Sequence, residues 1–390
     1  MIFALIAALL CLIGLVQALA GAALAGQFGN AATTPAGRRS GTQPGISILK
    51  PLHGDEPMLE AALASLCVQD YPDWQIVFGV ADRVDPALAI VRRLQARFPK
   101  ADIAVVVDPT RHGANGKVGN LINMLPAAKH DALAIADSDL HVAPDYLARL
   151  ADALAEPNTG LVTTLYAGLP ATRTLAARLA AMQITHVFLP GALLARAMGR
   201  QDALGATMLL RRDTLARIGG LHALVDHLAD DQVLGRRVQA LGLAVRLAHT
   251  LSATTVPETT LAALWRHELR WARTIRALVP GPFAASILQY PLFWALLAVA
   301  LSLGAAWSWG IFLLAWVVRS AAALWVDRAL EPLLDGIADD PNAPAGLAFA
   351  CPVWLFPLRD LISVAVMFAS YAGRRVEWRG HTMTADTPAP

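Results

Sequence analysis

The sequence predicts an α/β domain with a doubly wound, mostly parallel sheet, joined to apolar helices at both ends of the chain. Composition is the first reason: of 390 residues, 56% are hydrophobic and 16% are charged, whereas soluble proteins carry roughly 25% charged residues. The second is distribution, because charges are scarce at the two ends and ordinary in residues 42–280. The third is that this middle region alternates strand-like and helix-like segments, which is typical of parallel strands with helical crossovers.

The N-terminal segment is predicted to be a membrane anchor. No charged residue occurs before Arg38, and residues 1–25 are long enough to cross a bilayer as a helix. A cleaved signal peptide is the alternative, but the usual basic start is missing, so an uncleaved anchor is favoured. Arg38 and Arg39 follow the apolar run and place the next domain in the cytoplasm by the positive-inside rule. Residues 26–44, rich in Ala, Gly and Thr, are expected to be a linker.

Residues 45–280 are expected to form the α/β domain. Short apolar runs predict four strands, and helical spacing between them predicts three crossover helices. The strands are expected at residues 46–49, 75–81, 103–107 and 132–136, and the helices at 57–67, 86–97 and 117–127. The sequence has no Gly-X-Gly-X-X-Gly after the first strand and no P-loop, which argues against the common dinucleotide and nucleoside triphosphate sites.

The C-terminal part is predicted to return to the membrane, with membrane segments in residues 281–373 and a cytoplasmic tail in 374–390. The uncharged stretch 277–318 has room for two spans. A third apolar region, 346–372, is interrupted by the Arg359-Asp360 pair, which is costly in lipid unless it is partnered. A basic tail demands an even number of crossings after the domain. Either the third region is re-entrant or interfacial, or the tail departs from the rule.

The fourth predicted strand ends on two carboxylates. Residues 132–136 are apolar and lead directly into Asp137-Ser138-Asp139. A buried strand delivers such side chains to its carboxyl end, the edge where open α/β sheets bind ligands. Two carboxylates one residue apart can share a hard cation such as Mg²⁺ or Mn²⁺, which keeps positions for phosphate oxygens. The triplet indicates a metal-bound nucleotide diphosphate, although alone it is more often a turn or a helix cap.

Polar residues also follow the other three predicted strands. The first, second and third strands are followed by Lys50, Asp82 and Asp108. The carboxyl edge of the sheet, called the rim below, could therefore contact a base, a ribose and a metal diphosphate. A glycine-rich turn at residues 112–117 opens the next helix, and its backbone N–H groups together with the Lys117 ammonium suit phosphate. Ordinary turn residues and exposed loop lysines are the alternative explanation.

The order of these motifs resembles that of a known family. The motifs are Lys50-Pro51-Leu52-His53-Gly54, Asp70-Tyr71-Pro72, Asp82 with Asp85-Pro86, Gly113-X-Asn115-X-Lys117, Asp137-Ser138-Asp139, Asp230-Asp231 and Arg270-Trp271. Over residues 46–271 they follow the order found in ceramide glucosyltransferase-like enzymes, which are membrane-bound, inverting transferases of the GT-A fold, in the same broad class as cellulose and hyaluronan synthases. The chain looks most like the bacterial hopanoid-biosynthesis branch, which is expected to pass N-acetylglucosamine from UDP to bacteriohopanetetrol.

The resemblance implies roles for single residues. It places Asp82 on the uridine, Asn115 and Lys117 on nucleotide or phosphate, and Asp137 and Asp139 on the Mg²⁺ or Mn²⁺ ion and the diphosphate. Such a cation offsets the charge on departing UDP. The expected donor-binding residues are Lys50, Asp82, Asn115, Lys117, Asp137, Arg270 and Trp271, and the expected metal ligands are Asp137 and Asp139.

Asp231 matches the third aspartate of the family, the general base. A hydroxyl is a poor nucleophile until its proton is taken, and a positioned carboxylate supplies this, typically 10²–10⁴-fold. The alternative is that Asp230 and Asp231 only stabilise the first turn of a helix. Arg270 can neutralise diphosphate, and Trp271 can wall the acceptor site. His267 departs from the family pattern, which has Gln or Arg there, and its role is left open.

For two further segments the sequence leaves two interpretations open. The arginine-rich helix around Arg270 could be an interfacial anchor attracted to anionic lipid. Residues 175–198 could be an amphipathic membrane-surface element or a core helix.

We therefore expect a divalent-metal-dependent, inverting transfer of a sugar, N-acetylglucosamine or glucose, from a UDP-sugar to a hydroxyl of a membrane lipid. Direct displacement is expected, because no second nucleophile is recognisable. The expected location is a bacterial inner membrane, crossed several times, with the catalytic domain facing the cytoplasm. The alternatives are a ceramide or glycolipid glucosyltransferase, a processive polysaccharide synthase and, least favoured, a membrane nucleotide-binding protein without catalysis. No nucleic-acid partner is expected.

Overall fold

An eight-stranded mixed sheet forms the centre of the domain, in a computed structural model that describes residues 1–33, 43–338, 351–373, 375–378 and 381–384. The strand order is β3-β2-β1-β4-β7-β6-β8-β5. The strands are β1 (Ile46–Pro51), β2 (Trp74–Val80), β3 (Ile103–Val107), β4 (Ala132–Ala136), β5 (Leu140–His141), β6 (Thr159–Pro170), β7 (Thr207–Arg211) and β8 (Ala244–Val256).

The four predicted strands form the parallel half of this sheet. β1 pairs in parallel with β2 and β4, and β2 pairs in parallel with β3. Each begins and ends within two residues of its predicted position. Beyond β4 the sheet changes direction, because β7 runs antiparallel to β4 and β6, while β6 and β8 are parallel. The α/β fold with a mostly parallel sheet is confirmed, and this second half was not anticipated.

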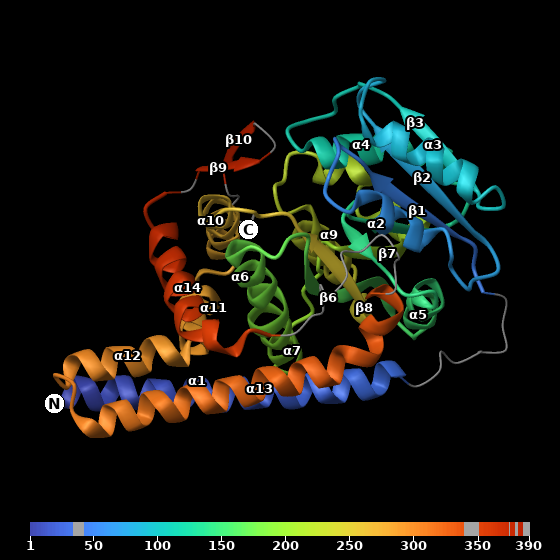
Figure 1. Cartoon of the computed structure of the whole chain (residues 1–390). Helices are drawn as coiled ribbons and strands as arrows, with labels where there is room; N and C mark the ends of the chain where they lie inside the picture. The colour runs from blue at the N-terminus through green and yellow to red at the C-terminus, as the bar shows by residue number, and fades with distance from the viewer. Residues whose placement is uncertain (34–42, 339–350, 374, 379–380, 385–390) are drawn as a thin grey trace.

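Helices cover both faces of the sheet (Figure 1). The three predicted crossover helices are confirmed as α2, α3 and α4. The helices within the domain are α2 (Leu59–Leu66), α3 (Ala87–Arg97), α4 (Gly116–Met124), α5 (Tyr146–Leu154), α6 (Leu175–Gln183), α7 (Leu189–Ala197), α8 (Arg212–Arg217), α9 (Asp230–Ala240) and α10 (Leu261–Leu278).

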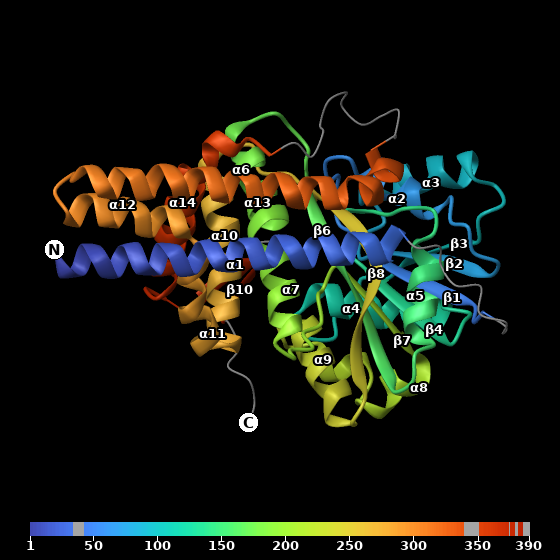
Figure 2. The same cartoon turned by 90° about the horizontal axis from the view of Figure 1, so that it is seen from below.

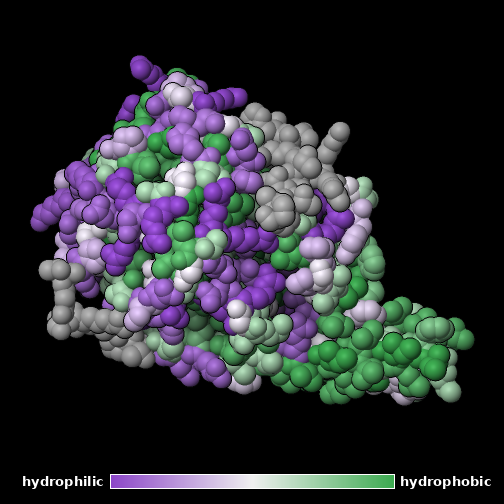
Figure 3. Space-filling view, turned by 180° about the vertical axis from the view of Figure 1, so that it is seen from behind, coloured by the Kyte–Doolittle hydropathy of each residue, from purple (hydrophilic) through white to green (hydrophobic). Residues whose placement is uncertain are grey.

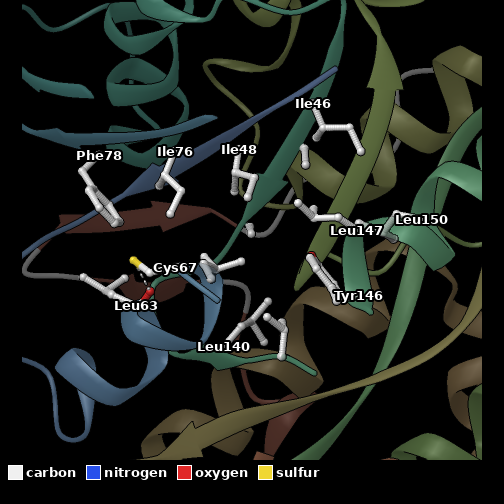
Figure 4. Packing of buried hydrophobic residues seen from close by; sticks show 14 of the residues in the cluster. Ile46, Ile48, Leu63, Cys67, Ile76, Phe78, Leu140, Tyr146, Leu147 and Leu150 are labelled. Carbon is white, nitrogen blue, oxygen red and sulfur yellow. Dashed lines mark hydrogen bonds between the residues drawn. The ribbon is translucent and has the colours of Figure 1, made fainter. Parts of the chain in front are cut away.

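Alternation of side chains along the central strands builds two separate cores. Ile48 and Phe78 point to one face, where they meet Leu63 of α2 and Leu147 of α5 (Figure 4). Their sequence neighbours point the other way, and Val77 packs with residues of α4 and α9. A strand buried on both faces is apolar throughout, which is why β1 and β4 could be recognised in the sequence.

The N-terminal helix α1 (Ile2–Thr33) continues past residue 25 into the segment expected to be a linker. Of the remaining expected linker, residues 34–42 lie outside the described residues. Packing explains the longer helix, because Ala25 and Phe28 are buried against β6, β8 and α13 (Ala306–Ala338). At Gly29 the two helices touch so closely that a Cβ would lie 2.2 Å from the carbonyl oxygen of Ala329.

Three helices, α1, α12 (Pro291–Leu301) and α13, lie side by side and project beyond the sheet domain (Figures 1 and 2). Their projecting surface is apolar (Figure 3), with residues such as Leu9 on α1 and Leu313 on α13 exposed. By length and composition, four helices of the described chain could cross a membrane, or five if the bent pair Pro280–Gln289 and Pro291–Leu301 counts as one span. Several apolar helices thus mark a membrane-associated protein.

The last apolar helix, α14 (Phe356–Ser370), runs across the direction of α1, α12 and α13 and packs on α10 (Figures 1 and 2). It carries the charged pair of the third apolar region, and neither residue faces outward, because Arg359 and Asp360 are both fully buried. Arg359 donates two hydrogen bonds, of 2.7 and 2.6 Å, to the carboxylate of Glu268 on α10. Asp360 accepts from the backbone N–H of Leu292 at 3.0 Å. The charges are therefore partnered within the protein.

The elements not yet described are short. They include α11 (Pro280–Ala285), the antiparallel strands β9 (Arg375–Trp378) and β10 (His381–Thr384), and short 3₁₀ helices at Leu125–Ala127, Leu221–Leu224, Ser286–Gln289 and Val353–Leu355. The two strands fall within the expected tail, 374–390, whose other residues lie outside the described residues.

The Arg359–Glu268 pair should dominate the stability of the helical region. Replacing Arg359 by Met leaves a buried carboxylate without its partner, which costs about 3–5 kcal/mol. The double variant Arg359→Met/Glu268→Leu removes both charges and should recover most of this loss. Thermal unfolding of the full chain in detergent measures both effects.

The exposed pair Arg93–Glu60, joined at 2.7 Å, provides a matched control, and Arg93→Met should cost under about 1 kcal/mol. Equal melting temperatures for Arg359→Met and Arg93→Met would contradict the assigned role.

Candidate functional site

A cavity of about 1200 Å³ opens at the carboxyl ends of the central strands and continues to the apolar helices. At the sheet end it is lined by Glu56, Asp108, Lys117, Asp137, Asp139 and Asp231. At the helical end it is lined by Gln17, Val187, Phe188, Phe283, Tyr290 and Met367. One continuous space thus joins a charged rim to α11, to α14 and, through Gln17, to α1.

The carboxylates after β4 lie where the sequence predicted them. Lys117 Nζ is 2.6 Å from Asp137 Oδ1 and 3.7 Å from Asp230 Oδ2. Asp139 accepts a hydrogen bond of 2.5 Å from Thr254 of β8. Between them Ser138 donates to Glu56 at 2.5 Å. β4, α4, α9 and β8 therefore each contribute a group to one small polar region.

The electrostatics of this region fit a divalent cation. Burial, and next the charge of Asp137, raise the pKa of Asp139 to about 6. Burial lowers the pKa of Lys117, but the nearby Asp137 and Asp230 outweigh burial and hold it above its ordinary value. Carboxylates crowded enough to raise one another's pKa gain from a hard cation with oxygen ligands. Asp137 and Asp139 could hold Mg²⁺ or Mn²⁺ on this chemistry.

Two of the predicted donor-binding residues do not line the cavity. Lys50 is fully buried in the central strand β1, and its Nζ has no hydrogen-bond partner among the described residues. Burial lowers its pKa to about 8, against the opposing pull of Asp139 and Asp137. Asp82 is exposed after β2 and accepts from the N–H of Val84 at 3.0 Å. Only its neighbour Ala81 reaches the cavity lining.

Asn115 lines the cavity, but its side-chain oxygen and amide nitrogen form hydrogen bonds with other groups of the protein. It caps α4, where its side-chain oxygen accepts from the N–H groups of Lys117 and Val118 at 3.0 and 3.2 Å. Its amide donates to the carbonyl oxygen of His227 at 2.8 Å. Asn115 therefore fixes the helix end that carries Lys117 and ties it to the loop before α9.

Asp231 lies in the first turn of α9 and also lines the cavity. The first-turn position agrees with the helix-stabilising alternative, and the general-base role stays a prediction. Its carboxylate accepts from the N–H of Gln232 at 2.7 Å. Gly205 makes room for it, since a Cβ there would lie 2.9 Å from Asp231 Oδ2. Burial, and next the charge of Asp230, raise the pKa of Asp231 to about 7. A carboxyl group with such a pKa can accept a proton near neutral pH.

Helix α10 presents Arg270 and Trp271 to the cavity, together with His267. The ring of His267 meets the Trp271 ring edge-on, with centroids 4.5 Å apart. His267 Nδ1 is hydrogen-bonded to Glu258, a buried residue that also lines the cavity. The sequence did not predict Glu258 as a site residue, because its partner His267 is nine residues away and no sequence spacing links the two.

The segment 175–198 forms α6, a π-helical turn at Ile184–Phe188 and α7. Its buried residues pack against β6, β8 and the apolar helices. Ile184 and Val187 line the cavity. This agrees with the core-helix alternative and adds a role in the cavity wall.

Comparison with known proteins decides the family. The model for glycosyl transferase family 21 matches residues 4–388. The chain belongs to glycosyl transferase family 21. The predicted glycosyltransferase, the GT-A fold and the likeness to ceramide glucosyltransferases are thereby confirmed. The assignment to the hopanoid branch stays a prediction.

Curated relatives include ceramide glucosyltransferases. The protein of Komagataella phaffii is 34% identical over 114 residues, which are 28% of this chain and 22% of that protein. Ceramide glucosyltransferase 1 of Caenorhabditis elegans is 22% identical over 254 residues, 64% of this chain and 53% of that protein. The chain thus spans about half or less of the length of these relatives. Among solved structures, mannosyltransferase PcManGT from Pyrobaculum calidifontis, in complex with GDP-Man and Mn²⁺, is 18% identical, with a TM-score of 0.49 over 93% of this chain and 99% of that chain.

The raised pKa of Asp231 predicts the pH dependence of this family 21 enzyme. A general base acts when ionised, so kcat/KM should be low under acid conditions, rise with pH through about 7, and level off above it. Initial rates over a pH series at saturating metal measure this profile.

Asp145→Asn is a suitable control, because Asp145 is half-exposed, pairs with Arg149 and lies outside this cavity. It should leave the profile unchanged. An acidic limb centred at the ordinary aspartate pKa, near 4, would exclude Asp231 in this environment as the base.

Proposed function

We propose that the enzyme transfers N-acetylglucosamine or glucose from a UDP-sugar to a hydroxyl of a membrane lipid, with inversion at the sugar. The observation that supports this is the single cavity, which holds the carboxylate rim at one end and reaches the apolar helices at the other. A water-soluble donor and a lipid acceptor need such a shared space. Resemblance to the hopanoid branch makes bacteriohopanetetrol the first acceptor to test. The named relatives make ceramide the second.

The donor end would be organised around the carboxylates after β4. Asp137 and Asp139 would hold a divalent cation, which offsets the charge that develops on the leaving diphosphate. Lys117 at the start of α4 and Arg270 on α10 add positive charge to the same cavity. An Arg fork and a Lys ammonium both suit phosphate oxygens.

Asp231 would act at the acceptor. Its carboxylate takes the proton of the attacking hydroxyl while that oxygen bonds to the anomeric carbon and the bond to the diphosphate breaks. The electron pair leaves with UDP, and attack from the opposite face inverts the centre. Trp271 and His267 line the same cavity. No covalent sugar–enzyme intermediate is required.

We infer that α1, α13 and the bent pair Pro280–Gln289 and Pro291–Leu301, which ends in α12, cross a bacterial inner membrane while α14 lies at its cytoplasmic surface. The exposed apolar stretch of α1 from Ile2 to Leu19 is about 27 Å long at 1.5 Å per residue, close to the hydrocarbon thickness. Two crossings after the domain return the chain to the side of the domain. In this arrangement the basic tail lies in the cytoplasm, and the number of crossings after the domain is even, as the positive-inside rule requires.

The decisive experiment identifies the product. Membranes containing the full chain are incubated with a panel of radiolabelled UDP-sugars and either bacteriohopanetetrol or ceramide, and labelled lipid is identified by mass spectrometry. Label in one lipid supports the proposal and selects the acceptor. Label in polymer would favour a polysaccharide synthase, and donor binding without any product would favour a non-catalytic protein.

Separate measurements of binding and turnover test the two carboxylate roles. Asp231→Asn should lower kcat by about 10²–10⁴-fold while UDP binding stays unchanged, because only proton transfer is lost. Asp139→Asn should weaken UDP binding in the presence of metal. Turnover that persists in Asp231→Asn would disprove the base assignment.

Removal of the divalent cation should abolish transfer. Dialysis against a chelator is expected to reduce product to background, and adding back Mg²⁺ or Mn²⁺ should restore it, because the leaving diphosphate needs the offsetting charge. Full activity in chelator-treated enzyme would rule out this role for Asp137 and Asp139.

A further inference from the structure

Within the helical region, three side chains able to bind a metal meet at a place outside the catalytic cavity. They are His186, Asp327 and Cys351, and one potential ligand atom from each lies within 4.8 Å of the others. None of the three lines the cavity. His186 belongs to the π-helical turn between α6 and α7, Asp327 to α13, and Cys351 to the segment that leads into α14.

The three residues are already held in place by the protein. His186 Nε2 lies 2.7 Å from Asp327 Oδ1, and the N–H of Cys351 donates to Asp327 Oδ2 at 3.2 Å. The His186 side chain is 3% exposed, and its Nδ1 has no hydrogen-bond partner among the described residues. Asp327 is 18% exposed and Cys351 is half-buried. Water can therefore approach from the Asp327 side.

One imidazole, one carboxylate and one thiol form a donor set that suits a borderline-soft ion. Zn²⁺ binds nitrogen and oxygen at about 2.0 Å and sulfur at about 2.3 Å, so tetrahedral ligands lie roughly 3.5 Å apart. Side-chain movements of about 1 Å would bring the present atoms to that separation. We propose that His186, Asp327 and Cys351 bind a Zn²⁺ ion, with water as the fourth ligand.

Proton balance sets the conditions for binding. The Cys351 thiol gives its proton to solvent and binds as thiolate, Asp327 binds as carboxylate, and His186 offers one ring nitrogen while the other keeps the proton. Binding therefore weakens as pH falls. The donor set also differs from that of Asp137 and Asp139, whose oxygen atoms favour hard cations. The two sites select different metals.

The ion would fix one wall of the cavity. Ile184, Val187 and Phe188 line the cavity from the same π-helical turn that carries His186. π-helical turns recur at functional sites. Arg319 of α13 already donates to the carbonyl oxygen of His186 at 2.8 Å. A metal shared with Asp327 and Cys351 would join this turn to α13 and to the start of α14.

Metal content tests the proposal independently of transferase activity. The full chain, purified in detergent with a tag that contains no histidine, carries Asp137→Ala and Asp139→Ala so that the other cation site is removed. It is dialysed against Zn²⁺, or against Co²⁺ as a spectroscopic probe, and then against metal-free buffer. We expect one metal per chain, a cobalt–thiolate charge-transfer band and a higher melting temperature with Zn²⁺.

Variants assign the ligands. In the same background, Cys351→Ser should remove the cobalt–thiolate band, and His186→Gln should reduce bound Zn²⁺ to background. Cys67→Ser is the matched control, because Cys67 is a buried cysteine of the sheet domain, and it should leave metal content unchanged. Melting curves show which variants are folded.

Two results would overturn the proposal. One is a folded parent protein without bound Zn²⁺, in which case the His186–Asp327 contact is only an interhelical hydrogen bond. The other is a cobalt–thiolate band that survives in Cys351→Ser. Neither result bears on the proposed transfer reaction, and failure of that reaction would leave the metal measurement intact.

Discussion

The contact of Lys117 with Asp137 and Asp230 is the interaction on which the site depends. Asp137 ends the parallel half of the sheet, and Asp230 begins α9, which packs on the other half. Four carboxylates in one region, Asp137, Asp139, Asp230 and Asp231, repel one another. Three of them, Asp139, Asp230 and Asp231, have raised pKa values as a result of burial and this crowding. The ammonium group of Lys117 offsets part of that repulsion and fixes the geometry of the rim. A divalent cation would offset the rest, which is why the same groups suit a metal diphosphate.

A second charged contact connects this rim to the apolar helices. Glu268 lies two residues before Arg270 on α10 and is held by Arg359 of α14 in a buried, bidentate pair. Burying two charges is costly, and such a pair persists where its geometry is needed. Here it fixes the helix that presents Arg270 and Trp271 to the cavity against a helix of the apolar region. The positions of Arg270 and Trp271 in the cavity and the packing of the apolar helices therefore depend on the same contact.

The sequence predicted the parallel strands and their helices closely because each is short, apolar and bounded by turn residues, so the information is local. It did not predict β6, β7 and β8, whose pairing joins residues far apart in the chain. The carboxylates at residues 137, 139 and 231 were predicted to lie together, and they line one cavity. Lys50 and Asp82 were predicted from their place after a strand, yet a strand end does not say which side chain faces the cavity. Lys50 is fully buried and does not line the cavity, and Asp82 lies in an exposed turn.

By itself the sequence determined the apolar ends, the α/β alternation, the motif order that marks the family, and the residue types of the acidic rim, because these are properties of composition and short spacing. Only the tertiary structure decided that α1 extends into the domain, that the Arg359-Asp360 pair is buried against α10 and α12, and that Glu258 holds His267. Each of these is a contact between segments distant in sequence. Its free energy depends on burial and geometry, which spacing along the chain does not encode.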